Sequence, residues 1–326
     1  MVQLTADQIA AIEKLNSILF RYADSKRKEM IQRKGRFVHY TSAENALSII
    51  RSRCLWMRNT NCMSDYREVH HGFDVLRRFF GDNANRELFT TALNGCFPGI
   101  AEEVIAQFDQ TLQSNQLQTY IASISEHDDR EDTHGRLSMW RAFGNSTARV
   151  ALVVNVDLEL GQNANLGAEL SPVAYFTDVE FAEELHAVIT QVAEHQQFLT
   201  SIGRPWLLAS LLSMLTSAMV CLKHEGFREE REWRVVHQPA RHSSQHISST
   251  IETVACVPQR VHKLPLRSDA GAGLAGLDPD QLVDRIIIGP TQYPSPIIEA
   301  FASVLRDAGV KDAHTRIVIS QIPVRT

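Results

Sequence analysis

The pattern of hydrophobic and polar positions predicts a chain that interleaves short strands with helices. Short alternating or continuous apolar runs are typical of strands, and apolar residues three or four positions apart are typical of helices. On this basis we predict helices at 3–33, within 81–117, at 138–143 and at 294–308. Thr41 and Glu44 form a T-x-x-E sequence that predicts the capping box of a further helix. Strands are predicted at 37–40, 55–57, 120–125, 149–154, 285–289 and 317–322, with another beginning near residue 232.

The segment 178–223 has a helical pattern that is broken near Gly203 and Pro205, which predicts two helices. The second contains the uncharged run 206–222, which is nearly long enough to cross a bilayer. Serine and threonine residues interrupt this run, so the pattern favours a buried helix over a membrane span. Residues 238–281 have little periodicity, and the stretch SDAGAGLAGLD within them is typical of a flexible loop.

These elements together predict an α+β protein with a mixed central sheet surrounded by helices. The sequence contains no internal repeat and no clear linker that would divide it into two domains. We therefore expect an N-terminal helix within residues 1–35 and a single α+β domain at 36–326. The domain would carry a helical insertion at about 178–222.

Composition narrows the class of protein further. The chain has 326 residues, a hydrophobic content of 44% and a charged content of 22%, which are ordinary values for a globular protein. Its net charge of −5 argues against non-specific nucleic-acid binding through global charge. The five cysteines form no C-x-x-C pair, so neither a disulfide framework nor a structural zinc site is indicated. The N-terminus lacks the pattern of a secretory signal, and we expect a cytoplasmic protein without a membrane partner.

The stretch FREEREWRVV at 227–236 carries the most concentrated charge pattern in the chain. Glu230 and Glu232 are two positions apart, so on one strand they would project from the same face. A carboxylate pair at the start of a strand can hold negative charge against a reacting cationic centre. The alternative interpretation is a charged loop running into an edge strand, in which Arg228, Arg231 and Arg234 pair with the glutamates.

Other polar residues lie where strands end or share a face. His39 is at the end of a predicted strand beside a helix N-terminus, where it either hydrogen-bonds a ligand or bonds to the backbone as a structural histidine. Ser123 and Ser125 are expected on one face of a strand. The adjacent His70 and His71 would point to different sides of a helix and would not chelate a metal. The polar loop at 126–136 is a candidate for mobility or ligand contact, although its spacing matches no particular metal site.

Several of these motifs, in this order, resemble a bacterial family known as domain of unknown function 2971. The resemblance extends from about Arg36 to the C-terminus, and the family name implies no activity. It is carried by His39-Tyr40-Thr41, Ser123-Ile124-Ser125, Ser138-Met139-Trp140, Phe227 with Glu230-x-Glu232-Trp233-Arg234, and Ile287-Ile288-Gly289-Pro290.

The order histidine-aromatic-threonine, Ser-x-Ser and Glu-x-Glu also resembles that of ADP-ribosyltransferases. This resemblance implies an ADP-ribosyltransferase-like core and NAD as a consumed substrate. His39, with Tyr40 and Thr41 beside it, would hold the adenosine ribose, and Ser123 with Ser125 would orient the nicotinamide ribose. Glu232 would be catalytic, and Glu230 would engage the acceptor. An aromatic ring would stack on nicotinamide, for which we prefer Trp140 over Tyr40 and Phe143.

Breaking the nicotinamide–ribose bond develops oxocarbenium character, which an ionised glutamate stabilises. Arg231 or Arg234 would help keep Glu232 charged. The resemblance therefore leads us to expect an NAD-consuming enzyme of the kind found among bacterial toxins and phage-defence effectors. Its acceptor would be protein, nucleic acid or water. Two alternatives stay open: a catalytically silent module that binds a nucleotide, and a nucleic-acid-processing defence protein that uses the basic run KRKEMIQRKGR.

Overall fold

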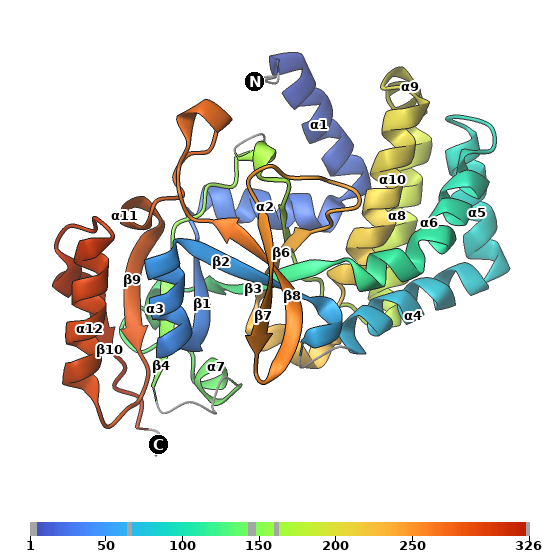
Figure 1. Ribbon diagram of the computed structural model, residues 1–326. Helices are drawn as coiled ribbons and strands as arrows, with labels where there is room; N and C mark the ends of the chain where they lie inside the picture. Colours follow the sequence, from blue (N-terminus) through green and yellow to red (C-terminus); the bar gives the residue numbers. More distant parts are fainter. Residues whose placement is uncertain (1–4, 64–66, 143–147, 160–162, 324–326) are drawn as a thin grey trace.

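The computed structural model describes residues 5–63, 67–142, 148–159 and 163–323, and Figure 1 shows the arrangement of its elements. Within these residues one mixed sheet lies at the centre, with its strands in the order β10-β9-β4-β1-β3-β2-β8-β7. Two more strands are attached at the other edge of β3, where β6 pairs with β3 and β5 pairs with β6. The pair β9–β10 is parallel and the others are antiparallel, so the predicted α+β architecture with a mixed sheet flanked by helices is confirmed.

The strand bounds follow the predicted hydrophobic runs closely in the first half of the chain. The strands are β1 Arg36–Ser42, β2 Cys54–Asn59, β3 Tyr120–His127, β4 Arg149–Val154, β5 Glu169–Pro172, β6 Glu232–His237, β7 Ser248–Val254, β8 Val257–Pro265, β9 Val283–Ile288 and β10 Ile317–Ile319. The predicted aperiodic region 238–281 is wrong in part, because β7 and β8 form an antiparallel hairpin there. Its first strand is rich in serine, threonine and glutamate and is exposed at the sheet edge, so it lacks the apolar alternation that marks a buried strand.

Helices cover both faces and one end of the sheet (Figure 1). The helix α3 packs with α12 against β4 and β9, and α7 packs on the opposite face of the same strands. The largest core joins α1, α4, α5, α6, α8 and α10 beyond the β6 edge. The helices are α1 Ala6–Leu19, α2 Arg21–Gln32, α3 Ala43–Ser52, α4 Arg67–Gly81, α5 Asn83–Asn94, α6 Ile100–Leu117, α7 Leu137–Ala142, α8 Asp178–Glu194, α9 Gln196–Ser201, α10 Arg204–Val220, α11 Pro279–Leu282 and α12 Pro294–Asp307.

Three helix predictions need correction. The single helix predicted at 3–33 is two helices, since the chain leaves helical geometry at Phe20. The predicted capping box at Thr41 is wrong, because the side chain of Ser42 caps α3 by accepting the N–H of Asn45, while Thr41 is still in β1. The segment 178–223 contains three helices rather than two, with the predicted break at Gly203 confirmed. The apolar run within it forms α10, and among the described helices none is both long enough and apolar enough to span a membrane.

The strand β3 changes partner along one of its edges. Its C-terminal half pairs with β1 through Val38 and Ser125, and its N-terminal end pairs with β2 through Arg58 and Ile121. The strands β1 and β2 therefore diverge from β3 like the arms of a fork. We call this place the β1/β2 fork.

Register determines which side chains share a face, because directly opposed residues in an antiparallel pair point the same way. One face carries Ser125 opposite Val38 and Glu232, and we call it the Glu232 face. The other face carries Trp233 opposite Ile124, and His39 opposite Leu152 of β4. We call this second side the His39 face.

Candidate active site

The carboxylate of Glu232 lies at the start of β6 and is almost completely buried, with 6% of the side chain exposed. Its Oε1 accepts a hydrogen bond of 2.6 Å from Ser123 Oγ and one of 2.9 Å from Arg234 Nε. Its Oε2 lies 3.2 Å from Arg234 Nη2 and 3.5 Å from Lys223 Nζ. We refer to Ser123, Lys223, Glu230, Glu232 and Arg234 as the Glu232 centre.

The Glu232 centre keeps its buried carboxylate ionised. Burial by itself raises the pKa of Glu232, but Arg234, Lys223 and the Ser123 hydroxyl outweigh that cost and hold the pKa below its usual range. Arg234 is itself anchored, since its Nη1 donates to the backbone carbonyl of Val220 at the end of α10. Of the two arginines expected to support the charge, Arg234 does so, whereas Arg231 is half exposed and lies 3.8 Å from Asp128.

Glu230 and Glu232 meet at one cation, though not by strand alternation. Glu230 ends the 3₁₀ segment Glu225–Glu230, and Arg231 follows it with a left-handed φ of 46° before β6 begins. The predicted start of the strand near residue 232 is confirmed, and Glu230 therefore lies outside the strand that holds Glu232. Lys223 joins them instead, with Nζ 2.7 Å from Glu230 Oε2 and 3.5 Å from Glu232 Oε2. Glu230 is the more accessible carboxylate, with 28% of its side chain exposed.

The serines and Tyr40 lie on the Glu232 face, as the strand pairing requires. Ser125 is directly opposite Glu232, and Ser123 is opposite Arg234. Tyr40 lies on the same side two positions beyond Val38, and its hydroxyl accepts a 2.8 Å hydrogen bond from the N–H of Arg136. The structure therefore brings together the serine motif, Tyr40 and the two glutamates on one side of the sheet.

His39 and Thr41 lie on the opposite, His39 face. The ring of His39 nevertheless reaches the β1/β2 fork, where Nδ1 is 2.9 Å from the backbone carbonyl of Ser123. Burial lowers the pKa of His39, and the bond to Ser123 offsets this only partly, so the ring is neutral and Nδ1 carries the proton. This is the backbone-bonded arrangement considered as the alternative for His39, and its ring and the Glu232 carboxylate approach Ser123 from different sides.

Trp140 is in α7 and is 1% exposed. Its ring packs edge-on against Tyr40 at 4.9 Å between centroids, and its indole N–H donates to the carbonyl of His134. The ring is therefore part of a closed core in this structure and contacts a protein ring edge-on rather than facing solvent. Phe143, the other ring considered outside β1, lies beyond the described residues.

Sequence reasoning missed three contributors to the site. Lys223 follows the apolar helix α10 and gives no motif, yet 4% of its side chain is exposed and it links both glutamates. Tyr175 accepts the backbone N–H of Glu232 through its hydroxyl at 2.8 Å. Arg136 donates to the backbone carbonyls of Glu229 and Glu230 at 2.9 and 3.1 Å, which ties α7 to the segment before β6. Each of these contacts depends on tertiary packing that no local pattern encodes.

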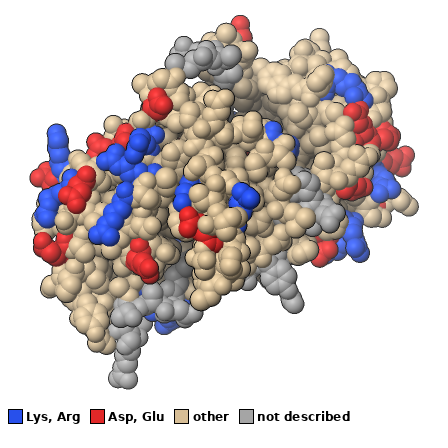
Figure 2. Space-filling view, viewed as in Figure 1, with Lys and Arg blue, Asp and Glu red and all other residues tan. Residues whose placement is uncertain are grey.

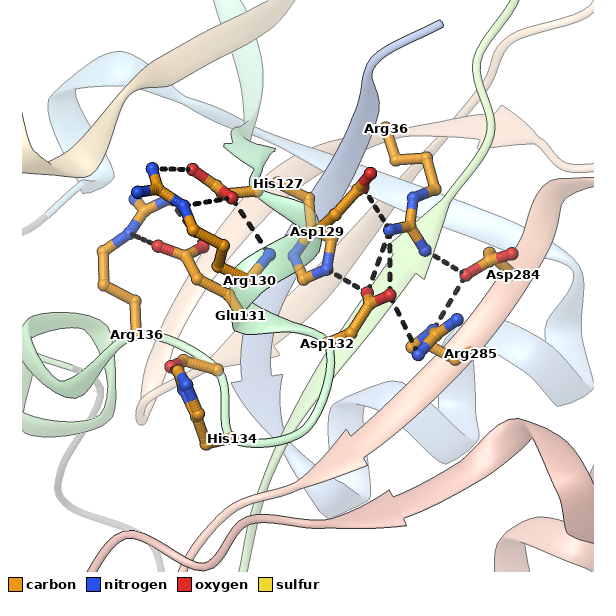
Figure 3. Close-up of polar contacts among 12 residues, drawn as sticks. Arg36, His127, Asp129, Arg130, Glu131, Asp132, His134, Arg136, Asp284 and Arg285 are labelled. Carbon is orange, nitrogen blue, oxygen red and sulfur yellow. Dashed lines mark hydrogen bonds and ion pairs between the residues drawn. The ribbon is translucent and has the colours of Figure 1, made fainter.

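A second ionic cluster lies at the C-terminal end of β3, two residues beyond Ser125, and Figure 3 shows its polar contacts. Arg36 is 2.6 Å from Asp284, 2.9 Å from Asp132 and 2.5 Å from Asp129. His127 Nε2 lies 2.7 Å from Asp132, while its Nδ1 has no hydrogen-bond partner among the described residues. We call these residues, with Arg285, the Arg36 network. The loop at 126–136, considered a candidate for mobility, is held to β1 and β9 by this network.

The described part of the chain contains no group of three or more histidine, cysteine, aspartate or glutamate side chains arranged to hold a metal ion.

The comparisons with known proteins concern the middle of the chain. A family model described as "Protein of unknown function (DUF2971)" matches residues 139–235, which run from α7 to β6 and include Trp140, Lys223, Glu232 and Arg234. No curated protein and no solved structure matches the chain. The segment that holds most of the Glu232 centre is thus similar to this family of unknown function, over a shorter range than the motifs had predicted.

Proposed function

We propose that the chain is an NAD-consuming enzyme resembling ADP-ribosyltransferases, with Glu232 as the catalytic carboxylate. One observation carries the proposal. The Ser-x-Ser and Glu-x-Glu motifs are 109 residues apart in sequence, and Ser123 Oγ donates to Glu232 Oε1 at 2.6 Å. These are the two motifs that the resemblance assigns to the same ribose.

The contacts of Glu232 suggest how it would act. Its Oε1 already accepts two short bonds, whereas both contacts of Oε2 are longer than the 2.7–2.9 Å typical of charge-assisted bonds. A carboxylate oxygen has room for two partners, so Oε2 is the oxygen that a ribose hydroxyl would compete for most easily. A bond from the ribose 2′-hydroxyl to this oxygen strengthens as positive charge builds on the ribose.

Glu230 and Lys223 would complete the site in this proposal. Lys223 is closer to Glu230 than to Glu232, so it can keep its ion pair with Glu230 when a substrate hydroxyl approaches Glu232. The greater exposure of Glu230 suits the role of meeting an acceptor, which would be a protein side chain, a nucleic acid or water.

A specific observation favours a second candidate, a nucleotide-binding module without catalysis. The Glu232 carboxylate is neutralised by two cations, which weakens its attraction for a developing positive charge. The basic run that would support a nucleic-acid-processing protein is, in contrast, largely paired internally. Lys28 and Arg27 bind Asp24, and Arg33 binds Glu126. Figure 2 shows both signs of charge at each end of the visible face and no basic field across it.

The test is nicotinamide release from NAD by the purified chain, with and without host-cell lysate. We expect turnover in the wild type and its loss in Glu232→Gln. Ser123→Ala, which keeps every charge in place, should lower turnover by roughly tenfold through the lost hydrogen bond. Glu252→Gln on the β7–β8 hairpin is the matched control, because Glu252 pairs with Lys263 far along the sheet from the site.

The outcomes separate the two candidates. Glu232→Gln leaves Arg234 and Lys223 with less compensation, so thermal unfolding must show that the variant is folded at the assay temperature. NAD binding without turnover in the wild type would support the binding module. If the wild type shows no NAD binding and no turnover, both candidates are eliminated. The Glu232 centre would then be a structural ion-pair cluster.

A further inference from the structure

A cavity of about 560 Å³ lies on the His39 face of the sheet, away from Glu232. Its floor includes Ile124, Leu152 and Trp233 from three strands. The helices α1 and α2 form one wall and α10 forms another. Figure 1 shows α2 above the sheet and α10 in the helical bundle beside it. The cavity has the size of small-molecule sites in proteins, which commonly enclose about 300–1,000 Å³.

The lining is mainly aliphatic and aromatic. Leu15 contributes from α1, Phe20 from the junction of α1 and α2, Leu170 from β5, and Trp206 from the first turn of α10. Such a lining favours an apolar ligand, because burial of apolar surface stabilises binding by about 25 cal/mol per Å². Ser210 and Ser213 of α10 also reach the wall, so the helix presents small side chains where bulk would fill the space.

His39 of β1 offers a hydrogen-bond acceptor to this apolar space. His39 lines the cavity, and its Nδ1–H donates to the carbonyl of Ser123. A neutral imidazole that donates through Nδ1 carries a lone pair on Nε2. No hydrogen bond to Nε2 of His39 occurs among the described residues, so a ligand with an N–H or O–H group would find an acceptor there.

The charged residues at the cavity disfavour anionic ligands. Among the described lining residues Arg27 is the only cation, and it is bound to Asp24 at 2.8 Å. Asp157, Glu159 and Glu169 also line the cavity. The excess of carboxylates opposes anions, which disfavours both fatty acids and the diphosphate of a dinucleotide.

We propose that this cavity is a binding site for an apolar small molecule, neutral or cationic, that carries a hydrogen-bond donor directed at His39. The site is distinct from the Glu232 centre, and its occupation does not depend on NAD turnover. Trp233 and Ile124 form part of its floor, and their strand neighbours Glu232 and Ser123 point to the other face.

The experiment measures binding of three probes by fluorescence titration of the full chain. Aminoanthracene is apolar and neutral and donates an N–H, anthracene has the same shape without a donor, and palmitate is an apolar anion tested by displacement. We expect aminoanthracene to bind most tightly, anthracene more weakly by roughly fivefold, in line with one hydrogen bond, and palmitate least. No binding of aminoanthracene, or tighter binding of palmitate than of both neutral probes, would overturn the proposal.

Variants locate the bound probe. Ser210→Trp fills the cavity from α10 and should abolish binding of both neutral probes, whereas Leu88→Trp places a tryptophan on the exposed surface of α5 and should leave binding unchanged. If Ser210→Trp does not fold, Leu170→Trp fills the space from β5. Unaltered aminoanthracene binding in a folded cavity-filling variant would place the probe elsewhere and refute the site.

His39→Phe tests the polar contact. The variant also loses the hydrogen bond from Nδ1 to the Ser123 carbonyl, and this loss affects the binding of both probes alike. Only the ratio of the two probe affinities therefore reports on the contact made by Nε2. We expect the preference for aminoanthracene over anthracene to disappear. A preserved preference would show that His39 does not accept the ligand's hydrogen bond and would refute this assignment.

Discussion

The Glu232 centre and the Arg36 network are both ionic clusters beside strand β3, yet they join very different parts of the chain. Arg36 binds residues 93, 96 and 248 positions away in sequence, and so connects β1, the loop after β3 and β9. The ion pairs of Glu232 reach only 2 and 9 positions along the chain, to Arg234 and Lys223. Among the described residues, Ser123 donates a distant hydrogen bond to the carboxylate of Glu232, and the hydroxyl of Tyr175 accepts the backbone N–H of the same residue.

This difference distinguishes a cluster that fixes tertiary structure from one whose structural role is small. Ion pairs between distant segments offset the entropy lost in closing long loops. A structural role is therefore sufficient to explain the Arg36 network. Burying a carboxylate and two cations within one short stretch incurs a desolvation cost with little gain in tertiary order. A function for the Glu232 centre would explain why that cost is accepted.

The largest expected effect is the loss of activity on changing Glu232. We predict that Glu232→Gln lowers nicotinamide release by about 10²- to 10³-fold, because the variant removes the charge that stabilises the transition state. Asp132→Asn changes a partly exposed carboxylate of the Arg36 network and should leave activity within about twofold. If both folded variants lost nicotinamide release equally, the loss would reflect general damage to the protein. It would then not distinguish the Glu232 centre from the Arg36 network.

The second effect is on stability, and it concerns the Arg36 network rather than the Glu232 centre. Arg36→Met removes the cation shared by three aspartates and should lower the free energy of unfolding by about 2 kcal/mol. Urea denaturation followed by tryptophan fluorescence measures this change. Activity at a temperature where the variant is folded should remain near that of the wild type. A variant as stable as the wild type would show that the network does not hold the loop.

The sequence predicted elements whose own residues determine them. Apolar residues within the elements themselves determined the positions of the strands β1, β3, β4 and β9 and of the helices α10 and α12. The β7–β8 hairpin did not, because it turns through Ala255 and Cys256 with positive φ rather than through an Asn-Gly pair.

The candidate site was less predictable because it depends on strand register. Alternation places Ser123 and Ser125 together, but only long-range pairing shows that His39 lies on the other face. The left-handed Arg231 separates Glu230 from the strand that holds Glu232, and nothing in the sequence required that conformation. Lys223 was missed because one lysine after an apolar helix is usually a solvated end.

The third effect is a difference in acid sensitivity. Burial lowers the pKa of His127, and Asp132 offsets this only partly, so the folded state binds a proton less readily than the unfolded state. Stability should therefore fall as pH decreases below about 6.5, where the unfolded histidine takes up a proton. In His127→Gln the slope of unfolding free energy against pH between about 7 and 5 should be shallower. The pKa of Glu232 lies below the usual range, so Glu232 should contribute nothing to that slope.

The smallest effect compares the two serines. Ser123→Ala removes a bond to a buried carboxylate and should cost about 1 kcal/mol of unfolding free energy. Ser125→Ala should cost less than about 0.5 kcal/mol, since the Ser125 hydroxyl makes no hydrogen bond within the described residues. Thermal unfolding of both variants checks the order, and a larger loss at Ser125 would reverse it.

The β1/β2 fork also divides the sheet into two parts that can open separately. The strands β7, β8 and β2 connect to the remainder of the sheet through a short pairing at one end of β3, and β1 connects to β3 through a similarly short pairing at the other end. The strand β7 lies at the sheet edge, whereas β4 pairs with β1 on one side and with β9 on the other. Amide hydrogens of the β7–β8 hairpin should therefore exchange with deuterium through a partial opening. Those of β4, at the centre of the other ladder, should exchange only when the whole molecule unfolds.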